Sequence, residues 1–131
     1  MEFQSLNKLF LDRAEENSNN PFLWSKIDKE WKSLTWNETL EKVKEFSSGL
    51  KSHGIKPGDR IVIVSENRPE WIIADLAITL LGGITVPAYT TNTEDDHHYI
   101  LEHSGAKAVI ISNNILGNRL ALATTRTKDC K

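Results

Sequence analysis

The chain has 131 residues, which suits one domain, or a piece of one, with a hydrophobic core. Its 16 Lys and Arg residues against 18 Asp and Glu residues give a net charge of -2, so composition offers no electrostatic case for binding nucleic acid or an anionic membrane. An apolar share of 39%, with 8% aromatic residues, excludes a disordered segment.

The cysteine content and the N-terminus bear on the cellular location. Cys130 is the only cysteine, so an intrachain disulfide and a cysteine-based zinc site are excluded. The first residues lack the basic and apolar regions of an export signal, and Asp12, Glu15 and Glu16 argue against a transit peptide. We therefore expect a cytoplasmic protein, and peripheral contact with a membrane stays open.

One stretch, Trp71 to Ala88, has about the length of a membrane span and is mostly apolar. Asp75, Gly82 and Pro87 interrupt it. A helix and a strand buried between protein layers need the same hydrophobicity and tolerate such breaks. We therefore expect core elements here and no transmembrane segment.

The N-terminal part predicts a helix, a hairpin and a second helix. Ser5 to Glu16 is amphipathic, with Ser5 as its cap and an apolar face formed by Leu6, Leu9, Phe10 and Ala14. Two short strands, 22–27 and 31–34, flank a turn at Asp28-Lys29-Glu30 that lacks the usual Gly and Asn. Thr35 and Glu38 have capping-box spacing, and a helix follows until Gly54 with Leu40, Val43, Phe46 and Leu50 at helical intervals.

The central part predicts a βαβ unit. Strands at 60–65 and 84–89 flank a helix over 69–81, for which Asn67 is placed as the cap and Glu70 can reach back to it. Strands joined by such a helix are parallel.

The C-terminal part continues the same alternation. Thr93 and Asp96 begin a third helix that Ser104-Gly105 ends, a third buried strand covers 107–112, and a short helix is expected over 118–123. The polar run 124–131 follows, and 113–131 is the least specified part of the chain. The predicted fold class is α/β: a partial three-layer unit with a small, mainly parallel sheet between helices, preceded by a helix and a hairpin.

Three segments have the composition of a phosphate site but lack its pattern. Segment 65–69 follows a strand, but Glu66 would repel a phosphate and Pro69 removes an N–H donor. Arg68 could bind an anion there, although a surface contact is the simpler interpretation. Segment 104–107 lies between a helix and a strand, which is the wrong order, and 124–128 has no glycine.

Other chemistry is equally incomplete. Of the cluster Asp95, Asp96, His97, His98, Glu102 and His103, only His98 and Glu102 share a helical face at i,i+4, and acidic residues in a first turn are explained by the helix dipole. Loss of bound zinc in a His98→Ala variant would argue for a metal site. No nucleophile elbow is present, and packing explains Trp24, Trp31, Trp36 and Trp71 better than base stacking does.

Several motifs nevertheless resemble one family. Leu34–Leu40 (LTWNETL) resembles the first signature of the adenylate-forming, AMP-binding enzymes, which include acyl-CoA synthetases, luciferases and peptide-synthetase adenylation domains. Leu80–Tyr89 (LLGGITVPAY) resembles the second signature. Gly58–Arg60, Asn67–Trp71 and Tyr99–Lys107 look like the long-chain fatty acyl-CoA synthetase branch.

The resemblance implies that residues 1–131 are an incomplete N-terminal part of an AMP-binding domain. Such enzymes use ATP, Mg and coenzyme A to convert a fatty acid into acyl-CoA through an acyl adenylate, with release of pyrophosphate. The family's phosphate loop, nucleotide motifs and catalytic lysine lie downstream, and the signatures present here are structural. We therefore assign no catalytic, cofactor-binding or metal-binding residue, and expect this chain alone to bind no cofactor and to be inactive.

Two alternatives stay open. The chain could be a free-standing binding or regulatory module that pairs with a full-length synthetase. It could also come from an adenylate-forming enzyme with a different carboxylate substrate. If the chain is instead the N-terminal part of a synthetase, its partner is the remainder of that chain, and the whole enzyme binds fatty acid, ATP and CoA.

Overall fold

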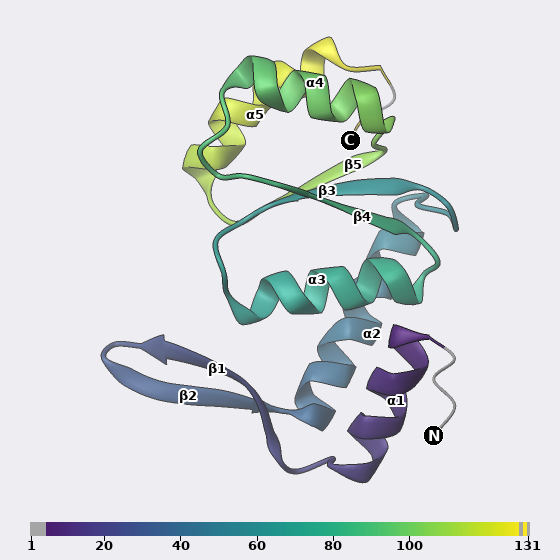
Figure 1. Cartoon of the computed structure of the whole chain (residues 1–131), viewed down its shortest axis with the longest axis vertical. Coiled ribbons are helices and arrows are strands. Elements are labelled where there is room, and N and C mark those ends of the chain that lie inside the picture. The colour runs from purple at the N-terminus through teal and green to yellow at the C-terminus, as the bar shows by residue number, and fades with distance from the viewer. Residues whose placement is uncertain (1–4, 129, 131) are drawn as a thin grey trace.

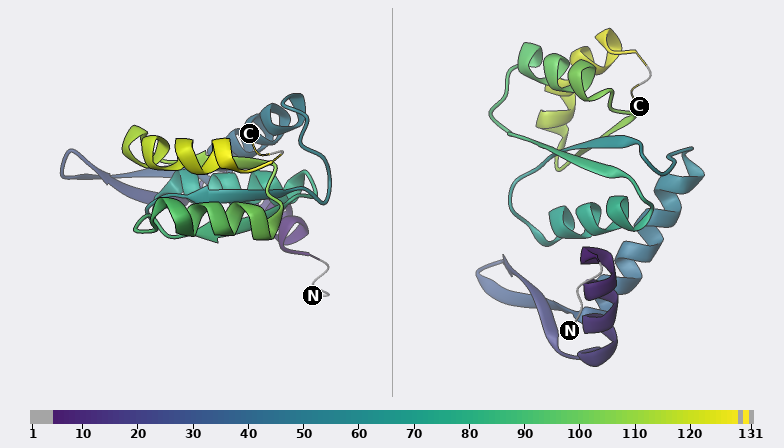
Figure 2. Two further views of the ribbon diagram at one scale, coloured as in Figure 1. Left: turned by 90° about the horizontal axis from the view of Figure 1, so that it is seen from above. Right: turned by 45° about the vertical axis from the view of Figure 1, so that its right-hand side comes forward.

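The chain folds into a small parallel sheet between helices, with a helix and a hairpin beside it (Figures 1 and 2). The computed structural model describes residues 5–128 and 130. In chain order its elements are α1 (Leu6–Glu16), β1 (Pro21–Ile27), β2 (Glu30–Thr35), α2 (Trp36–Ser52), β3 (Arg60–Val64), α3 (Pro69–Leu80), β4 (Ile84–Ala88), α4 (Glu94–Ser104), β5 (Ala108–Ile111) and α5 (Asn114–Arg126).

Strand β3 is central in the sheet, whose order is β4-β3-β5 with both pairs parallel. Its side chains alternate between two cores. Val62 and Val64 pack on the side of α4 and α5, whereas Ile61 and Ile63 pack on the side of α2 and α3. The predicted three-layer α/β arrangement is therefore confirmed, because a strand apolar on both faces needs helices on both sides.

The hairpin forms although its turn lacks Gly and Asn. Strands β1 and β2 pair in antiparallel fashion, and the two-residue turn places Asp28 and Lys29 at φ values of 50° and 69°. Positive φ at both central residues defines a type I′ turn, which matches the twist of the strands. Glu30, predicted in the turn, instead belongs to β2.

Aromatic packing fixes the base of the hairpin to the helices. The rings of Phe22 and Trp36 stack with their centroids 3.7 Å apart, and Phe10 of α1 lies 6.1 Å from each. Phe10 and Ala14 form the buried face of α1, while Leu6, predicted on that face, is exposed. The distal half of the hairpin projects from the body of the molecule (Figure 1).

Replacing Lys29 by glycine is expected to stabilise the protein by about 1 kcal/mol, because a side chain in the left-handed region costs roughly 1–2 kcal/mol that glycine avoids. Urea unfolding followed by circular dichroism measures the change. Ser33→Gly in the exposed face of β2 is the matched control and should destabilise the protein. Equal effects of both substitutions would contradict the prediction.

Three of the four predicted helix caps are present. The side chains of Ser5, Thr35 and Thr93 each accept a hydrogen bond from the backbone N–H three residues on, and the last two belong to complete capping boxes. The predicted cap of α3 by Asn67 is wrong. Pro69 is the first helical residue, so Arg68 occupies the cap position, without a side-chain capping bond.

The last helix is longer than predicted. Helix α5 begins at Asn114 rather than 118, and Asn113 caps it by accepting a hydrogen bond from Leu116 N–H at 2.9 Å. Gly105 ends α4 in the left-handed conformation with φ 62°, as the Ser104-Gly105 stop predicts.

The apolar stretch Trp71–Ala88 is divided between two elements. Its first part lies within α3 and its last part forms β4, with Gly82 at φ 85° between them. Among the helices of the described residues, none combines the length and the apolar character that crossing a bilayer requires. The stretch supplies core instead, with Ala77 and Ile78 fully buried.

Candidate functional site

The carboxyl ends of β3 and β5 form the crevice where an open α/β sheet usually binds its ligand. The chain leaves β3 toward α3 on one face of the sheet and leaves the neighbouring β5 toward α5 on the other (Figure 1). Connections that diverge in this way open a crevice between the two strands. Segment 65–69, singled out from the sequence, lies at this crevice, together with Ser112 and Asn113.

The carboxylate of Glu66 joins the two loops across this crevice. Its Oε2 accepts a hydrogen bond from Ser112 Oγ at 2.5 Å, and its Oε1 accepts one from Asn113 Nδ2 at 3.1 Å. The hydrogen bond from Ser112 is the main cause that holds the pKa of Glu66 below its ordinary value. A carboxylate kept ionised in this place repels phosphate, in agreement with the interpretation of the sequence.

Arg68 is engaged by the protein itself. Its Nε donates to Glu70 Oε2 at 2.9 Å and its Nη1 donates to the carbonyl of Ser112 at 3.3 Å. The predicted surface contact is therefore present. These bonds connect the start of α3 with the end of β5, so that the crevice is spanned by side chains of the chain's own loops.

The acidic and histidine-rich start of α4 caps that helix and forms hydrogen bonds with the neighbouring helix α5. Asp96 Oδ2 accepts hydrogen bonds from Thr93 N–H and Oγ1 at 2.9 and 2.8 Å, and Arg126 Nη1 donates to the carboxylates of Glu94 and Asp95 at 2.9 and 3.1 Å. His98 Nδ1 lies 3.2 Å from Thr127 Oγ1. Across residues 5–128 and 130, no three His, Cys, Asp or Glu side chains are arranged to hold a metal ion.

His97 is the exception in this segment, because it is only 1% exposed. Neither ring nitrogen has a hydrogen-bond partner within the described part of the chain. Burial is the main cause that lowers the pKa of His97, and the positive charge of Arg119 lowers it further. The sequence placed His97 in a candidate metal cluster and gave no sign that it is a core residue.

The stability of the protein is expected to fall as the pH drops below about 6.5, because the unfolded chain then protonates His97 while the folded chain resists protonation. Above that pH the residue is neutral in both states and contributes no pH dependence. A His97→Leu variant should lose this part of the pH profile and gain about 1 kcal/mol, since it removes two unpartnered polar atoms. Urea unfolding of both proteins between pH 5 and 8 tests this, and an unchanged slope in the variant would contradict it.

The four tryptophans divide into two pairs. Trp36 and Trp71 pack against the core clusters, as the sequence predicts. The sequence predicts core or subdomain packing for Trp24 and Trp31 as well; core packing is wrong for these two, because their exposed fractions are 55% and 66%. Both lie on the hairpin, where a two-stranded ribbon covers only part of each side chain.

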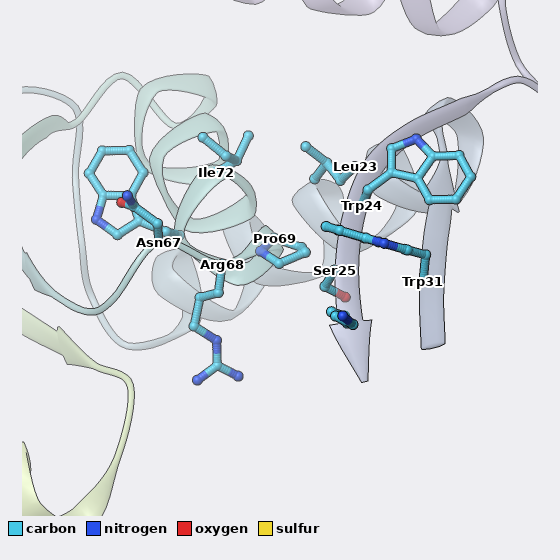
Figure 3. A pocket seen from close by; sticks show the side chains of 10 residues that line it. Leu23, Trp24, Ser25, Trp31, Asn67, Arg68, Pro69 and Ile72 are labelled. Atoms are coloured by element: carbon cyan, nitrogen blue, oxygen red, sulfur yellow. The ribbon is translucent and has the colours of Figure 1, made fainter. Parts of the chain in front are cut away.

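These exposed tryptophans line an open cleft of about 580 Å³ between the hairpin and the start of α3 (Figure 3). Leu23 and Ile72 point toward one another across it, and the ring of Trp31 extends over β1 toward Pro69. Its charged lining residues are Lys26 and Arg68. Sequence analysis missed this cleft, since its two walls are 36 or more residues apart along the chain.

The remaining candidate segments have structural roles. Residues 104–107 form the stop of α4, and α5 continues to Arg126 with Thr127 as its cap. Cys130 lies partly buried against the core cluster of α4 and α5.

The sequence pattern of the AMP-binding enzymes matches residues 10–130, almost the whole chain. The chain belongs to this family. A relative from Mycobacterium tuberculosis, a long-chain-fatty-acid–CoA ligase, is 39% identical over 80 residues, which are 61% of this chain and 13% of the relative.

Solved structures share the fold. A benzoate CoA ligase from Burkholderia xenovorans matches 95% of this chain and 24% of its own with a TM-score of 0.82 and 28% identity. The N-terminal subdomain of Klebsiella oxytoca NpsA matches 88% of this chain and 29% of its own with a TM-score of 0.74; at 21% identity this likeness concerns the fold alone. The fold is thus part of the N-terminal subdomain of the adenylate-forming enzymes, and the chain spans a small fraction of the length of these proteins.

Proposed function

We propose that the chain is the N-terminal portion of a long-chain fatty acid–CoA ligase. The observation that carries this proposal is the 39% identity to the mycobacterial long-chain ligase within a family match over residues 10–130. The overall reaction would join a fatty acid to CoA and convert ATP to AMP and pyrophosphate, through an acyl adenylate.

The residues described here do not fit ATP or its metal ion. The loop after β3 offers the Glu66 carboxylate and the proline at position 69 where a phosphate would need N–H donors. The carboxylates at the start of α4 are occupied by Thr93 and Arg126. Other parts of the whole protein would therefore bind ATP, Mg and CoA. This portion would contribute to the structural framework of the enzyme.

A pyrophosphate-release assay tests the proposal at two levels. A protein that carries this chain and the remainder of the ligase should release pyrophosphate with palmitate, ATP and Mg, and should form palmitoyl-CoA when CoA is added. The 131-residue chain by itself should show no release above background. Turnover by the isolated chain would overturn the scaffold role, and a whole protein inactive on every long-chain acid would overturn the substrate class.

A different carboxylate is the second candidate, because the benzoate CoA ligase is also 28% identical over nearly the whole chain. The same assay with benzoate in place of palmitate separates the two candidates. The higher specificity constant identifies the substrate class.

A free-standing regulatory module is the third candidate. Both β4 and β5 lie at sheet edges with no further strand paired to them in the described part of the chain, and open edges invite pairing. Binding of the isolated chain to a full-length synthetase, with a change in its activity, would favour this role. The cytoplasmic location stays a prediction.

A further inference from the structure

Strand β1 has an edge without a partner strand, and this edge faces the cleft between the hairpin and α3. Within the described part of the chain, the hairpin sheet consists of β1 and β2 alone. Figures 1 and 3 both show β1 between β2 and α3. Trp24, Ser25 and Lys26 of β1 line the cleft. The cleft therefore contains an open strand edge in addition to its apolar side chains.

The turn of the hairpin determines which backbone groups of β1 point into the cleft. A type I′ turn over residues 27–30 joins its first and last residues by a hydrogen bond, so Ile27 and Glu30 form a hydrogen-bonded pair. Hydrogen-bonded and non-hydrogen-bonded pairs alternate along an antiparallel ladder. Lys26 and Trp24 therefore belong to non-hydrogen-bonded pairs, and their N–H and C=O groups point away from β2, toward the open edge.

The side chains around this edge are apolar and cationic. Leu23, Trp31 and Ile72 converge on the cleft from its two walls (Figure 3). Among the described residues that line it there is no Asp or Glu. Lys26 is the exposed cation of the lining, whereas Arg68 is held by its own loops. A ligand that suits this cleft thus offers backbone groups, apolar side chains and a negative charge.

We propose that the cleft binds an extended acidic segment of a partner protein, which adds a third strand to the hairpin along β1. The backbone of the segment would pair with the outward N–H and C=O groups of Trp24 and Lys26. In such strand addition, main-chain hydrogen bonds provide affinity and the pockets for side chains provide specificity. This role goes beyond the proposed ligase activity, because it involves neither ATP nor an acyl substrate.

The cross-strand pairs of the hairpin indicate the side chains that the segment needs. Lys26 lies directly opposite Trp31, so the two share one face of the hairpin. An acidic and an apolar residue two positions apart in the segment would lie on that same face, beside Lys26 and Trp31. The residues between them would face Leu23 and Ile72, so an apolar residue is favoured there as well.

Other occupants fit this edge less well. A helix has no free backbone groups along its sides to pair with the N–H and C=O groups of β1. A second copy of the hairpin would bring another edge that carries Lys26, and like charges on paired strands destabilise a sheet. An extended acidic segment satisfies both the backbone and the charge.

Titration of the chain with the capped hexapeptide acetyl-Thr-Val-Ile-Glu-Val-Thr-amide tests the proposal. Tryptophan fluorescence should change and saturate at one peptide per chain, since Trp24 and Trp31 line the cleft. Two analogues carry N-methyl groups on alternate amides, one at the second, fourth and sixth residues and the other at the third and fifth. One analogue should bind about tenfold more weakly and the other should bind as the parent peptide does, because only one set of amides faces β1.

Two substitutions of Lys26 separate charge from backbone pairing. Lys26→Gln should weaken the acidic peptide about fivefold and leave unchanged the affinity for the peptide with glutamine in place of glutamate. Lys26→Pro removes an N–H that points outward, so the hairpin should stay paired while both peptides bind more weakly. Circular dichroism checks that each variant is folded. Lys32→Gln is the matched control, because Lys32 lies opposite Ser25 on the same hairpin but does not line the cleft.

Four results would overturn the proposal. The first is no saturable binding of the acidic peptide up to about 1 mM. The second is equal affinity for the parent peptide and both N-methylated analogues, and the third is an affinity for the acidic peptide that Lys26→Gln leaves unchanged. The fourth is a dimer in sedimentation that the peptide does not dissociate and that Lys26→Pro does, which would assign the edge to a second copy. None of these outcomes depends on whether the whole protein is a long-chain ligase, since neither nucleotide nor CoA is present.

Discussion

Replacing Ile63 by alanine is expected to lower the free energy of unfolding by about 3 kcal/mol, which is a large part of the stability of a domain this small. Ile63 is 0% exposed in the central strand and packs in the cluster formed with Leu50, Ala74 and Ile78. Its flanking strands hold the backbone in register, so the site cannot collapse around the missing methyl groups. Urea unfolding followed by circular dichroism measures the loss.

Ile84→Ala is the matched control for this prediction. Ile84 begins the neighbouring strand β4 and is 51% exposed, so the same truncation should cost less than about 1 kcal/mol. If both substitutions destabilise the protein equally, the central position of β3 in the core is wrong. An Ile63→Val variant should fall between the two, at about 1 kcal/mol.

The order and type of the elements follow from local signals in the sequence. The spacing of two residue pairs predicts the start of a helix: Thr35 with Glu38, and Thr93 with Asp96. The structure contains both capping boxes. The failures occur where two local rules compete. At the start of α3, proline at the first helical position determines where the helix begins and overrides the capping tendency of Asn67.

The hairpin shows how tertiary packing replaces a missing turn signal. Asp28 tolerates positive φ but Lys29 does not favour it, yet the turn forms because the stacked rings of Phe22 and Trp36 secure the base of the hairpin. A contact of this kind, between residues on different elements, cannot be predicted from a short stretch of sequence. The exposure of Trp24 and Trp31 is unpredictable for the same reason, since it depends on how closely other elements, such as the start of α3, pack against the hairpin.

The candidate sites were predictable only in part. The sequence alone indicates that the loop after β3 cannot bind phosphate through its backbone N–H groups, because Glu66 and Pro69 lie within the loop itself. The partners of that glutamate, Ser112 and Asn113, are more than 40 residues away, and only the β4-β3-β5 strand order brings them together. The hairpin cleft and the buried His97 likewise depend on contacts between distant segments.

Arg60, at the start of β3, connects this strand to the end of α4, and replacing it is expected to cause the second large loss of stability. Its Nε donates to the carbonyl of Ser104 at 2.7 Å, its Nη2 to that of Gly105 at 3.1 Å, and its Nη1 to that of Gly58 at 3.1 Å. The carbonyls of Ser104 and Gly105 lie at the C-terminal end of a helix, where the macrodipole is negative and a cation is favoured. An Arg60→Met variant is expected to lose about 2 kcal/mol of stability, because partly buried carbonyls then lack their charged donor.

Arg60→Lys distinguishes the effect of charge from that of geometry. A lysine keeps the positive charge near the helix end, but its single ammonium group cannot reach three carbonyls as the planar guanidinium does. We therefore expect Arg60→Lys to recover about half of the stability lost in Arg60→Met, as measured by urea unfolding. Full recovery by lysine would mean that the dipole alone matters, and a loss below about 0.5 kcal/mol in Arg60→Met would show that the two hydrogen bonds to Ser104 and Gly105 do not hold α4 to the sheet.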